Sequence, residues 1–405
     1  MKEFETYTLP NGIRGIHRQT RSNVAHCALV VNAGSRDERR SEYGIAHFTE
    51  HALFKGTRRR RAYQVNCRLE NLGGELNAYT TKEDTTLHAT TLRSDFSKAV
   101  ELIADIAFHS TFPERELAKE REVIADEINT YKDSPAEMIY DSFEDMIFAD
   151  SELGHNILGS KASLARYTTQ HLTDFVSRTY TTDQMVFSSI GGFSARTAQQ
   201  TAMRYLSEAS TPRRGFERMR AGAYAPFRTA QSKHTHQTHC SIGNRGYGLG
   251  DARRLPLSLL TNILGGPSAN SLLNISLREK HGLSYNIEAS YTPYTDDGIV
   301  SIYFSSDHGN ADHCMELIHK QLKALCDQPL SSRALSTARK QFIAQMSISM
   351  ESNEGYMLGA GKSYLVHNDM DTLDEAYAKV MAITAEEITE AARETFADMS
   401  YLIYK

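Results

Sequence analysis

Two histidines and a glutamate lie close together in the segment from residue 44 to 57, GIAHFTEHALFKGT. If this segment is helical, His47 and His51 are four residues apart and stack on one face. Two imidazoles placed in this way can bind one tetrahedral zinc ion. Glu50 could then reach a water molecule on the metal without binding the metal, which is the position of a general base. The H-x-x-E-H spacing therefore predicts a hydrolytic zinc site, provided that a third ligand exists; without one, it describes an ordinary surface helix.

The third ligand is expected on the long helix that Pro113 begins, PERELAKEREVIADEINTY. Glu120 and Glu127 are seven residues apart on it, nearly two turns, so both carboxylates face the same way. Acidic residues on so charged a helix more often face solvent, as we expect for Glu114 and Glu122. The helical period alone does not choose between Glu120 and Glu127.

The elements that must position these residues follow from hydrophobic periodicity and turn residues. An Asn11-Gly12 turn joins two expected strands, and the apolar run AHCALVVNA predicts a third strand that is buried. The expected strands of this half are 2–8, 13–19, 25–33, 75–83, 84–92 and 184–190, and its other helices are 63–72, 94–109, 136–148, 170–178 and 195–207.

The order of elements starts again after residues 210–226, an aperiodic segment rich in arginine, proline and glycine that we interpret as an interdomain linker. HCSIGNRGYG repeats the pattern of HCALVVNAG with an offset of 213 residues between Cys27 and Cys240. Two later segments repeat at nearly the same offset, which indicates a duplication.

The duplication predicts an α+β protein with two homologous domains of the α/β-sandwich type, 1–209 and 227–405. Each is expected to hold a mostly antiparallel sheet packed with helices. The second copy has LLTNILGG where the first has HFTEH. Only the N-terminal repeat is therefore expected to bind metal, while the C-terminal repeat would shape the site.

The composition, 40% apolar and 23% charged, is that of a soluble globular protein. A net charge of −5 argues against nucleic acid as a partner, since a binder must neutralise phosphates. No run of 18 apolar residues occurs that would span a membrane, and the first residues read as strand and turn rather than as a targeting segment. Five scattered cysteines suit a reducing compartment, so the cytoplasm is the expected location.

The motif residues together resemble the inverzincin M16 peptidases, which include pitrilysin, insulin-degrading enzyme and the mitochondrial processing peptidase. In this sequence His47-x-x-Glu50-His51 is followed 76 residues later by Glu127. The blocks GGELNAYT, EREVIADEI and LREKHGLSY also occur in the family's order. The resemblance covers nearly the whole chain, whose length is similar to that of the small bacterial members related to the processing peptidase.

The resemblance implies that His47, His51 and Glu127 bind Zn²⁺ and leave a fourth position for water. Glu50 would take a proton from that water and later give it to the leaving amine. Glu120 would orient a ligand or Glu50 without touching the metal.

The resemblance also implies how a peptide is held. Asn77 and Ala78 match the family's edge strand, on which an extended peptide adds as one more strand. Arg278 and Tyr285 match the residues that steady the substrate carbonyl as charge develops on its oxygen. In two-chain members this pair reaches the metal from the partner subunit across an enclosed chamber. A homodimer with two composite sites is therefore the expected assembly.

The expected function is hydrolysis of peptide bonds in unfolded peptides or small polypeptides. The alternatives are a non-catalytic scaffold subunit of the same fold and a peptidase for one particular precursor. The intact set of expected ligands and substrate contacts argues against the scaffold. Two departures concern the second repeat: Asn270-Ser271-Leu272 lacks the family's arginine, and His281 stands where arginine is frequent.

The expected function assigns no role to two further motifs. The run Arg58–Arg61 could attract acidic substrates, but such a run is more typical of a solvated loop or helix start. The histidines of HTHQTH, namely His234, His236 and His239, are interpreted as part of an exposed strand.

Overall fold

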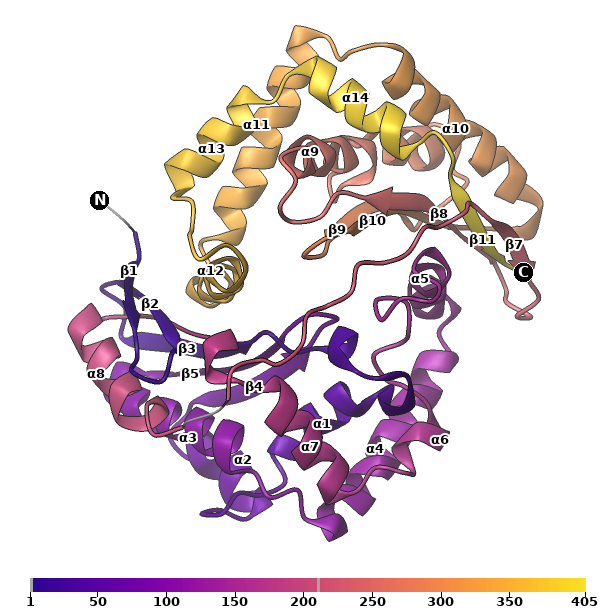
Figure 1. The fold of residues 1–405 in the computed structure, drawn as a ribbon. Helices are drawn as coiled ribbons and strands as arrows, with labels where there is room; N and C mark the ends of the chain where they lie inside the picture. The colour runs from indigo at the N-terminus through magenta and orange to yellow at the C-terminus, as the bar shows by residue number, and fades with distance from the viewer. Residues whose placement is uncertain (1–2, 210–211) are drawn as a thin grey trace. The chain divides into compact units, whose positions relative to one another are not determined.

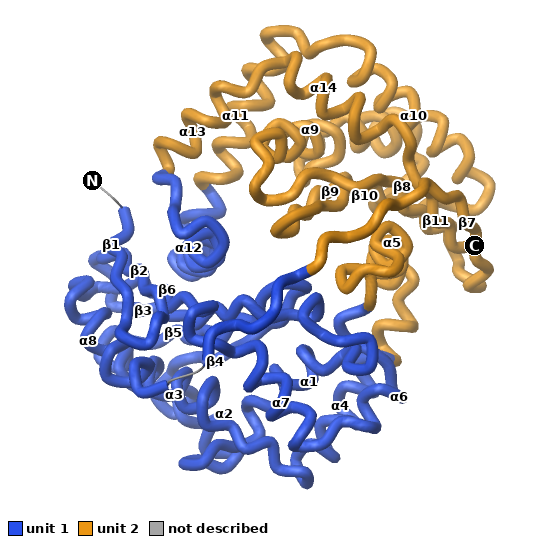
Figure 2. The backbone as a smooth tube through the Cα atoms, in the orientation of Figure 1, with its two compact units in different colours: residues 1–128, 156–218, 348–372 blue, residues 129–155, 219–347, 373–405 orange. Residues whose placement is uncertain are grey.

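A computed structural model describes residues 3–209 and 212–405 (Figure 1). The chain divides into two compact units, and each is built from three separate stretches of sequence (Figure 2). Unit 1 contains residues 1–128, 156–218 and 348–372, and unit 2 contains residues 129–155, 219–347 and 373–405. The beginning of the first predicted strand and the first two residues of the predicted linker lie outside the described residues.

Unit 1 contains a six-stranded sheet with the order β1-β2-β6-β3-β5-β4. Its strands are β1 (Glu5–Thr8), β2 (Arg14–Gln19), β3 (Val24–Val31), β4 (Glu75–Thr80), β5 (Thr85–Leu92) and β6 (Met185–Gly191). Neighbouring strands are antiparallel except for β2 and β6, which are parallel. The strand β4 therefore lies at an edge of the sheet.

One face of this sheet carries the main core of unit 1. The helices that contribute buried side chains to it are α1 (Ile45–Leu53), α2 (Ala62–Glu70), α3 (Phe96–His109), α4 (Glu114–Lys132), α6 (Lys161–Leu164), α7 (Thr169–Thr179) and α8 (Ala195–Leu206). Strand β3 alternates, so that Cys27 and Leu29 enter this core while Ala28 and Val30 face the other side. Because both faces are covered, β3 reads in the sequence as a continuous apolar run.

The second face is covered by α12 (Asn353–His367), a helix of the C-terminal half that packs across β3 and β6 (Figure 1). Its Met357 and Tyr364 join the small core that Val30 and Ile16 form on this face. Gly361 allows the close approach, because a Cβ atom there would lie 3.0 Å from the Cβ of Ser188 and 3.1 Å from Cγ2 of Val30.

We expect Gly361→Leu to lower the free energy of unfolding by about 1–3 kcal/mol, since the added side chain has no room against β3 and β6. A suitable control is Gly359→Leu, because a Cβ at Gly359 would meet nothing within 4 Å. That change should stabilise by about 0.5–1 kcal/mol through helix propensity alone. Thermal unfolding of both variants checks the prediction, and an unchanged melting temperature for Gly361→Leu would contradict this packing.

Unit 2 contains a five-stranded sheet with the order β7-β11-β8-β10-β9. Its strands are β7 (Arg228–Gln231), β8 (Thr238–Gly246), β9 (Ile287–Pro293), β10 (Gly298–Ser306) and β11 (Ser400–Tyr404). One face packs on helices α9 (Arg254–Gly265), α10 (Ala311–Asp327), α11 (Ser332–Ser349), α13 (Leu373–Ala382) and α14 (Ala385–Thr395), and the other on α5 (Pro135–Ile147). Taken in chain order, these five strands occupy the same positions as β2 to β6 in unit 1, including the single parallel pair. This correspondence confirms the predicted fold class, two homologous domains of mixed α and β structure.

The two repeats exchange equivalent helices. α5 follows α4 in the first repeat but packs on the sheet of unit 2, and α12 follows α11 in the second repeat but packs on the sheet of unit 1. The compact units therefore differ from the repeats 1–209 and 227–405, which describe the order of elements along the chain. The described part of the predicted linker, 212–226, forms neither helix nor strand, and its Arg218 lies 2.7 Å from the buried Asp37 of unit 1.

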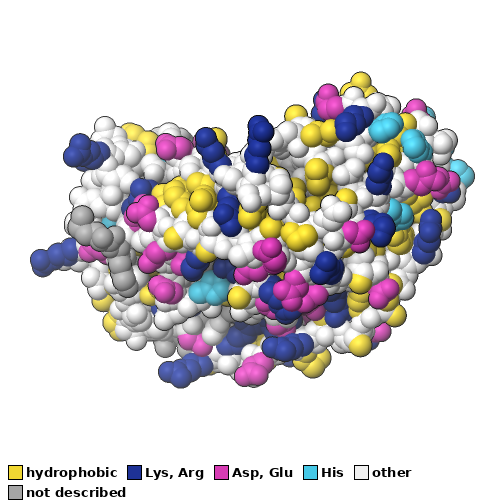
Figure 3. Space-filling model, turned by 90° about the horizontal axis from the view of Figure 1, so that it is seen from above, with side chains coloured by type: hydrophobic (Ala, Val, Ile, Leu, Met, Phe, Trp, Pro, Cys, Tyr) yellow, Lys and Arg dark blue, Asp and Glu magenta, His cyan; other side chains and the backbone are white. Residues whose placement is uncertain are grey.

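Basic and acidic side chains are interspersed on the face of the molecule that Figure 3 shows. Across residues 3–209 and 212–405, no helix has both the length and the hydrophobicity needed to cross a membrane.

Candidate metal centre

The helix α1 carries the H-x-x-E-H residues, and a buried carboxylate fixes its beginning. The N-cap is Gly44, whose φ of +94° favours glycine. Glu38 accepts hydrogen bonds from the backbone N–H groups of Gly44 at 2.9 Å and Ala46 at 2.7 Å. Burial raises the pKa of Glu38, while these two hydrogen bonds act in the opposite direction. Two otherwise unpaired N–H groups of the helix are thereby satisfied, and a negative charge at this end is favourable.

His47 and His51 lie on one face of α1, as their spacing predicts, with ring centroids 4.6 Å apart. The opposite face packs into the core of unit 1 through apolar side chains such as Phe48 and Leu53. Burial, together with the neighbouring His51, lowers the pKa of His47 to about 3. His47 is therefore neutral near pH 7, which is the form of histidine that binds metal.

Glu127 of α4 completes a three-residue group. Its two carboxylate oxygens lie 3.7 Å from Nε2 of His47 and 3.7 Å from Nε2 of His51. One ligand atom from each of the three residues lies within 4.8 Å of the others. Donors about 2.0–2.2 Å from a tetrahedral zinc ion are about 3.4 Å from one another. The group therefore fits one zinc ion, and two histidines with one carboxylate are a donor set of catalytic zinc sites.

Glu120 lies on α4, the helix that also carries Glu127, and contacts the Nδ1 side of His51. Its Oε1 is 2.8 Å from Nδ1 of His51, and its Oε2 is 2.6 Å from Nζ of Lys55. Burial would raise the pKa of Glu120, but the hydrogen bonds with His51 and Lys55 outweigh it and hold the pKa below its usual value. An ionised Glu120 keeps the proton of His51 on Nδ1 and leaves Nε2 free to bind metal.

Glu50 extends from α1 toward the end of the edge strand β4. Burial raises its pKa, against the opposing effect of hydrogen bonds from the hydroxyl and backbone of Thr80. A carboxylate with a raised pKa is suited to take a proton near neutral pH. Asn77 and Ala78 lie on β4 itself, as predicted, and β4 has a neighbouring strand on one side only.

Arg278 and Tyr285 belong to unit 2, and their role toward the metal residues of unit 1 stays a prediction. Arg278 lies in a π-helical turn, and its guanidinium carbon is 5.9 Å from the ring centroid of Tyr285. Tyr285 is 83% exposed, so its phenol is available to a ligand.

The prediction of a strand across HTHQTH is wrong for its first half. His234 and His236 precede β8, and His234 has a φ of +50°, which interrupts an extended chain. Only His239 lies on the strand, where its Nδ1 is 2.9 Å from the hydroxyl of Tyr303. Alternating histidine and threonine imitate the period of a strand without the apolar residues that would hold one in a sheet.

Sequence reasoning missed Glu38 and Lys55. Glu38 is not on the helix that it caps, and contacts between a loop and a helix leave no periodic signal. Lys55 follows α1 directly, and only its distance to Glu120 shows its part in the site.

Comparison with known proteins gives matches along the chain. Residues 16–161 match the family described as Insulinase (Peptidase family M16), and residues 166–342 match the family described as Peptidase M16 inactive domain. The uncharacterized zinc protease YmxG of Bacillus subtilis is 31% identical over 398 residues, which cover 98% of this chain and 96% of that protein. An uncharacterized zinc protease of Rickettsia bellii is 29% identical over 399 residues, with the same shares covered.

Solved structures show the same fold. A protease from Helicobacter pylori superposes with a TM-score of 0.92 at 20% identity and covers 99% of both chains. A peptidase M16 inactive domain from Pseudomonas fluorescens superposes with a TM-score of 0.91 at 17% identity and covers 99% of this chain and 98% of its own.

Proposed function

The chain belongs to peptidase family M16, and from this premise we propose that it is a zinc-dependent peptidase that hydrolyses peptide bonds in unfolded peptides or small polypeptides. The observation that carries the proposal is the meeting of His47, His51 and Glu127 from two helices, with Glu50 one residue from a ligand. Of the groups of histidine, cysteine and acidic residues in the described chain, only this one brings three ligand atoms so close together.

His47, His51 and Glu127 would hold the zinc ion through two imidazole nitrogens and a carboxylate. When bound, zinc lowers the pKa of water and polarises the substrate carbonyl. Glu50 accepts the proton of the attacking water on its carboxylate and passes it to the departing nitrogen. Glu120 holds His51 in the tautomer and orientation that this arrangement needs.

The edge strand β4 offers a place for the peptide. Its unpaired side can form backbone hydrogen bonds with an extended chain, which suits main chain of almost any sequence. Thr80 at the end of β4 hydrogen-bonds Glu50, so a peptide paired along Asn77 and Ala78 would pass the catalytic carboxylate. A folded protein cannot present a free strand in this way, and this restricts the substrates to unfolded segments.

We also propose a homodimer in which Arg278 and Tyr285 of one protomer complete the site of the other, around an enclosed chamber. A guanidinium and a phenol are donors suited to a carbonyl oxygen that gains negative charge. The five cysteines are free, which supports a reducing compartment such as the cytoplasm. Peptides, and not nucleic acid, are the proposed partners of the net negative chain.

Mixing two inactive variants tests the composite site. Arg278→Ala and Glu50→Gln should each abolish peptide cleavage while zinc content stays unchanged. If Arg278 acts in the partner's site, random exchange of subunits restores about a quarter of the wild-type rate, because half the dimers are mixed and each has one intact site. No recovery after verified exchange, or loss of zinc from Arg278→Ala, would exclude this role.

The function itself is tested by metal removal and return. We expect about one zinc per chain by elemental analysis, loss of cleavage of quenched fluorescent peptides after chelation, and recovery on addition of stoichiometric zinc. A protein that binds zinc but cleaves nothing from a broad peptide library would instead be a scaffold or partner-dependent subunit. Cleavage of a single precursor alone would identify a specific processing enzyme.

A further inference from the structure

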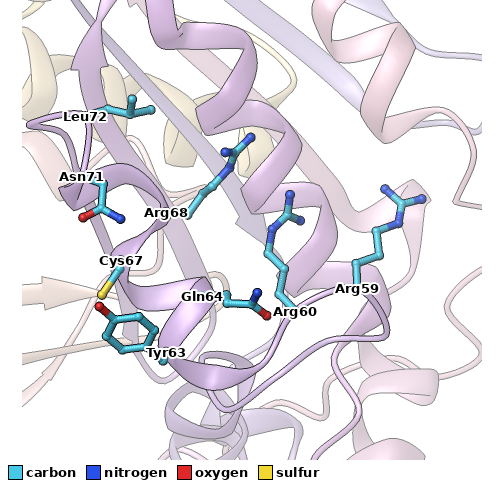
Figure 4. Close-up of a pocket in the computed structure, with 8 residues that line it drawn as sticks. All are labelled: Arg59, Arg60, Tyr63, Gln64, Cys67, Arg68, Asn71 and Leu72. Atoms are coloured by element: carbon cyan, nitrogen blue, oxygen red, sulfur yellow. The ribbon is translucent and has the colours of Figure 1, made fainter.

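A cavity of about 470 Å³ lies along α2 and the loop before it, within unit 1 (Figure 4). Its wall includes Arg59, Arg60 and Arg68, the amides Gln64 and Asn71, and the phenol of Tyr63. All of these groups donate hydrogen bonds, and none of the described lining residues is acidic. The cavity is therefore built for a ligand that carries negatively charged oxygens.

The three arginines differ in how far their charge is already used. Arg60 is held by both carboxylate oxygens of Glu101 at 2.8 Å and by Asp105 at 2.6 Å, and its side chain is 17% exposed. Arg68 lies 3.9 Å from Glu101 and its side chain is 40% exposed. Arg59 is exposed and forms no ion pair with the described residues. Arg60 is thus a fixed part of the wall, whereas Arg59 and Arg68 can take a ligand.

The arginines are spread out rather than gathered. Figure 4 shows the guanidinium groups of Arg59, Arg60 and Arg68 in a row, each apart from the next, rather than turned toward one point. A single phosphate is best held by donors that converge on it, whereas a row of separate cations suits a chain with several carboxylates. This arrangement favours a peptide with acidic side chains over a small phosphorylated ligand.

The cavity lies next to the edge strand on which the substrate is proposed to pair. Its wall reaches Leu72, and β4 begins at Glu75 after a two-glycine turn, so the two are at most about 11 Å apart along the chain. α2 also contacts β4. The other end of β4, Thr80, meets Glu50 about 17 Å further on. A peptide paired along β4 would therefore bring residues about five positions from the cleaved bond to the cavity.

We propose that this cavity binds acidic side chains of the peptide substrate, about five or more residues from the cleaved bond, through Arg59 and Arg68. The run of arginines from residue 58 to 61 adds positive potential around the opening, which attracts such segments from solution. This inference rests on the proposed function, because it places the acidic residues through the pairing of the substrate with β4.

The inference is tested with pairs of fluorescent peptides whose members are identical except that one carries three glutamates and the other three glutamines, five to seven residues from the cleaved bond. In one pair these residues precede the cleaved bond, and in a second pair they follow it. We expect kcat/KM to be about three- to tenfold higher for the glutamate peptide at low salt, mainly through KM, as a few partly exposed ion pairs provide. The preference should shrink as salt increases.

A double variant, Arg59→Gln with Arg68→Gln, tests whether these two arginines cause the preference for the glutamate peptide. Arg60 is left in place because it forms ion pairs with Glu101 and Asp105 of α3. The double variant should bring the ratio of the two peptides close to one. Arg196→Gln, which removes an exposed arginine from α8 in the same unit, should keep the wild-type preference. Equal rates for the two peptides in the wild type, or a preference that survives the double change, would overturn the inference.

A measurement of peptide binding without cleavage tests this inference separately from the proposed function. Fluorescence anisotropy of the same peptides with the Glu50→Gln protein needs no cleavage, and it should show tighter binding of the glutamate peptide that depends on Arg59 and Arg68. If this binding is found but no peptide is ever cleaved, the cavity is supported and the peptidase proposal fails. If inorganic phosphate displaces the peptide far more strongly than chloride at equal ionic strength, the cavity is a phosphate site and the inference is wrong.

Discussion

Glu50→Gln is expected to lower kcat by about 10²- to 10⁴-fold while the protein keeps its zinc, because the amide has the size of the carboxylate but cannot accept the proton of the attacking water. Glu50 is not among the three residues whose ligand atoms converge, so its change leaves the donor set intact. Cleavage of a fluorescent peptide and zinc content, measured on the same preparation, check both halves of this expectation.

A control for this variant is Glu70→Gln, which changes an exposed glutamate on α2. It should behave as the wild type in both measurements. Two results would contradict the role of Glu50: a variant that retains activity within a few fold, or one that loses zinc together with activity. The second would mean that Glu50 contributes to metal binding rather than to proton transfer.

The local geometry of the candidate site could be predicted from the sequence because it depends on short spacings. The four-residue interval between His47 and His51 is a property of any helix, and α1 has the apolar face that keeps this helix in place. The strands and the longer helices of the first half were likewise predictable from periods of 2 and 3.6 residues, and their ends differ from the structure by only a few residues, whereas the four-residue helix α6 was not predicted.

What could not be predicted depends on contacts between segments far apart in the chain. The carboxylate of Glu38 and the ammonium of Lys55 act on α1 and Glu120 from loops, where no period marks them. The exchange of α5 and α12 is invisible for the same reason, since an amphipathic pattern says that a helix packs but not on which sheet. The alternation of histidine and threonine wrongly predicted a strand at His234, whose left-handed backbone lies between β7 and β8.

The second large effect that we expect is loss of zinc on substitution of Glu127. The helical period does not distinguish Glu127 from Glu120 as the third ligand, but the structure does. Glu127 has both oxygens 3.7 Å from histidine nitrogens, whereas Glu120 contacts the far side of His51 and Lys55. Glu127→Gln should therefore leave the purified protein with far less than one zinc per chain and no activity, because it replaces an anionic ligand.

Glu120→Gln should instead weaken zinc binding by about 10- to 100-fold, as changes behind a metal ligand do. The chain would still be active when zinc is supplied in excess, since all three ligands remain. Glu122→Gln, an exposed position on the same helix, should bind zinc as the wild type does. Competition with a fluorescent zinc chelator gives the three affinities directly. If Glu120→Gln lost zinc as completely as Glu127→Gln and excess metal did not restore activity, Glu120 would be a ligand. Glu120 and Glu127, nearly two helical turns apart, would then both bind the metal, and Glu120 would not serve only to orient His51.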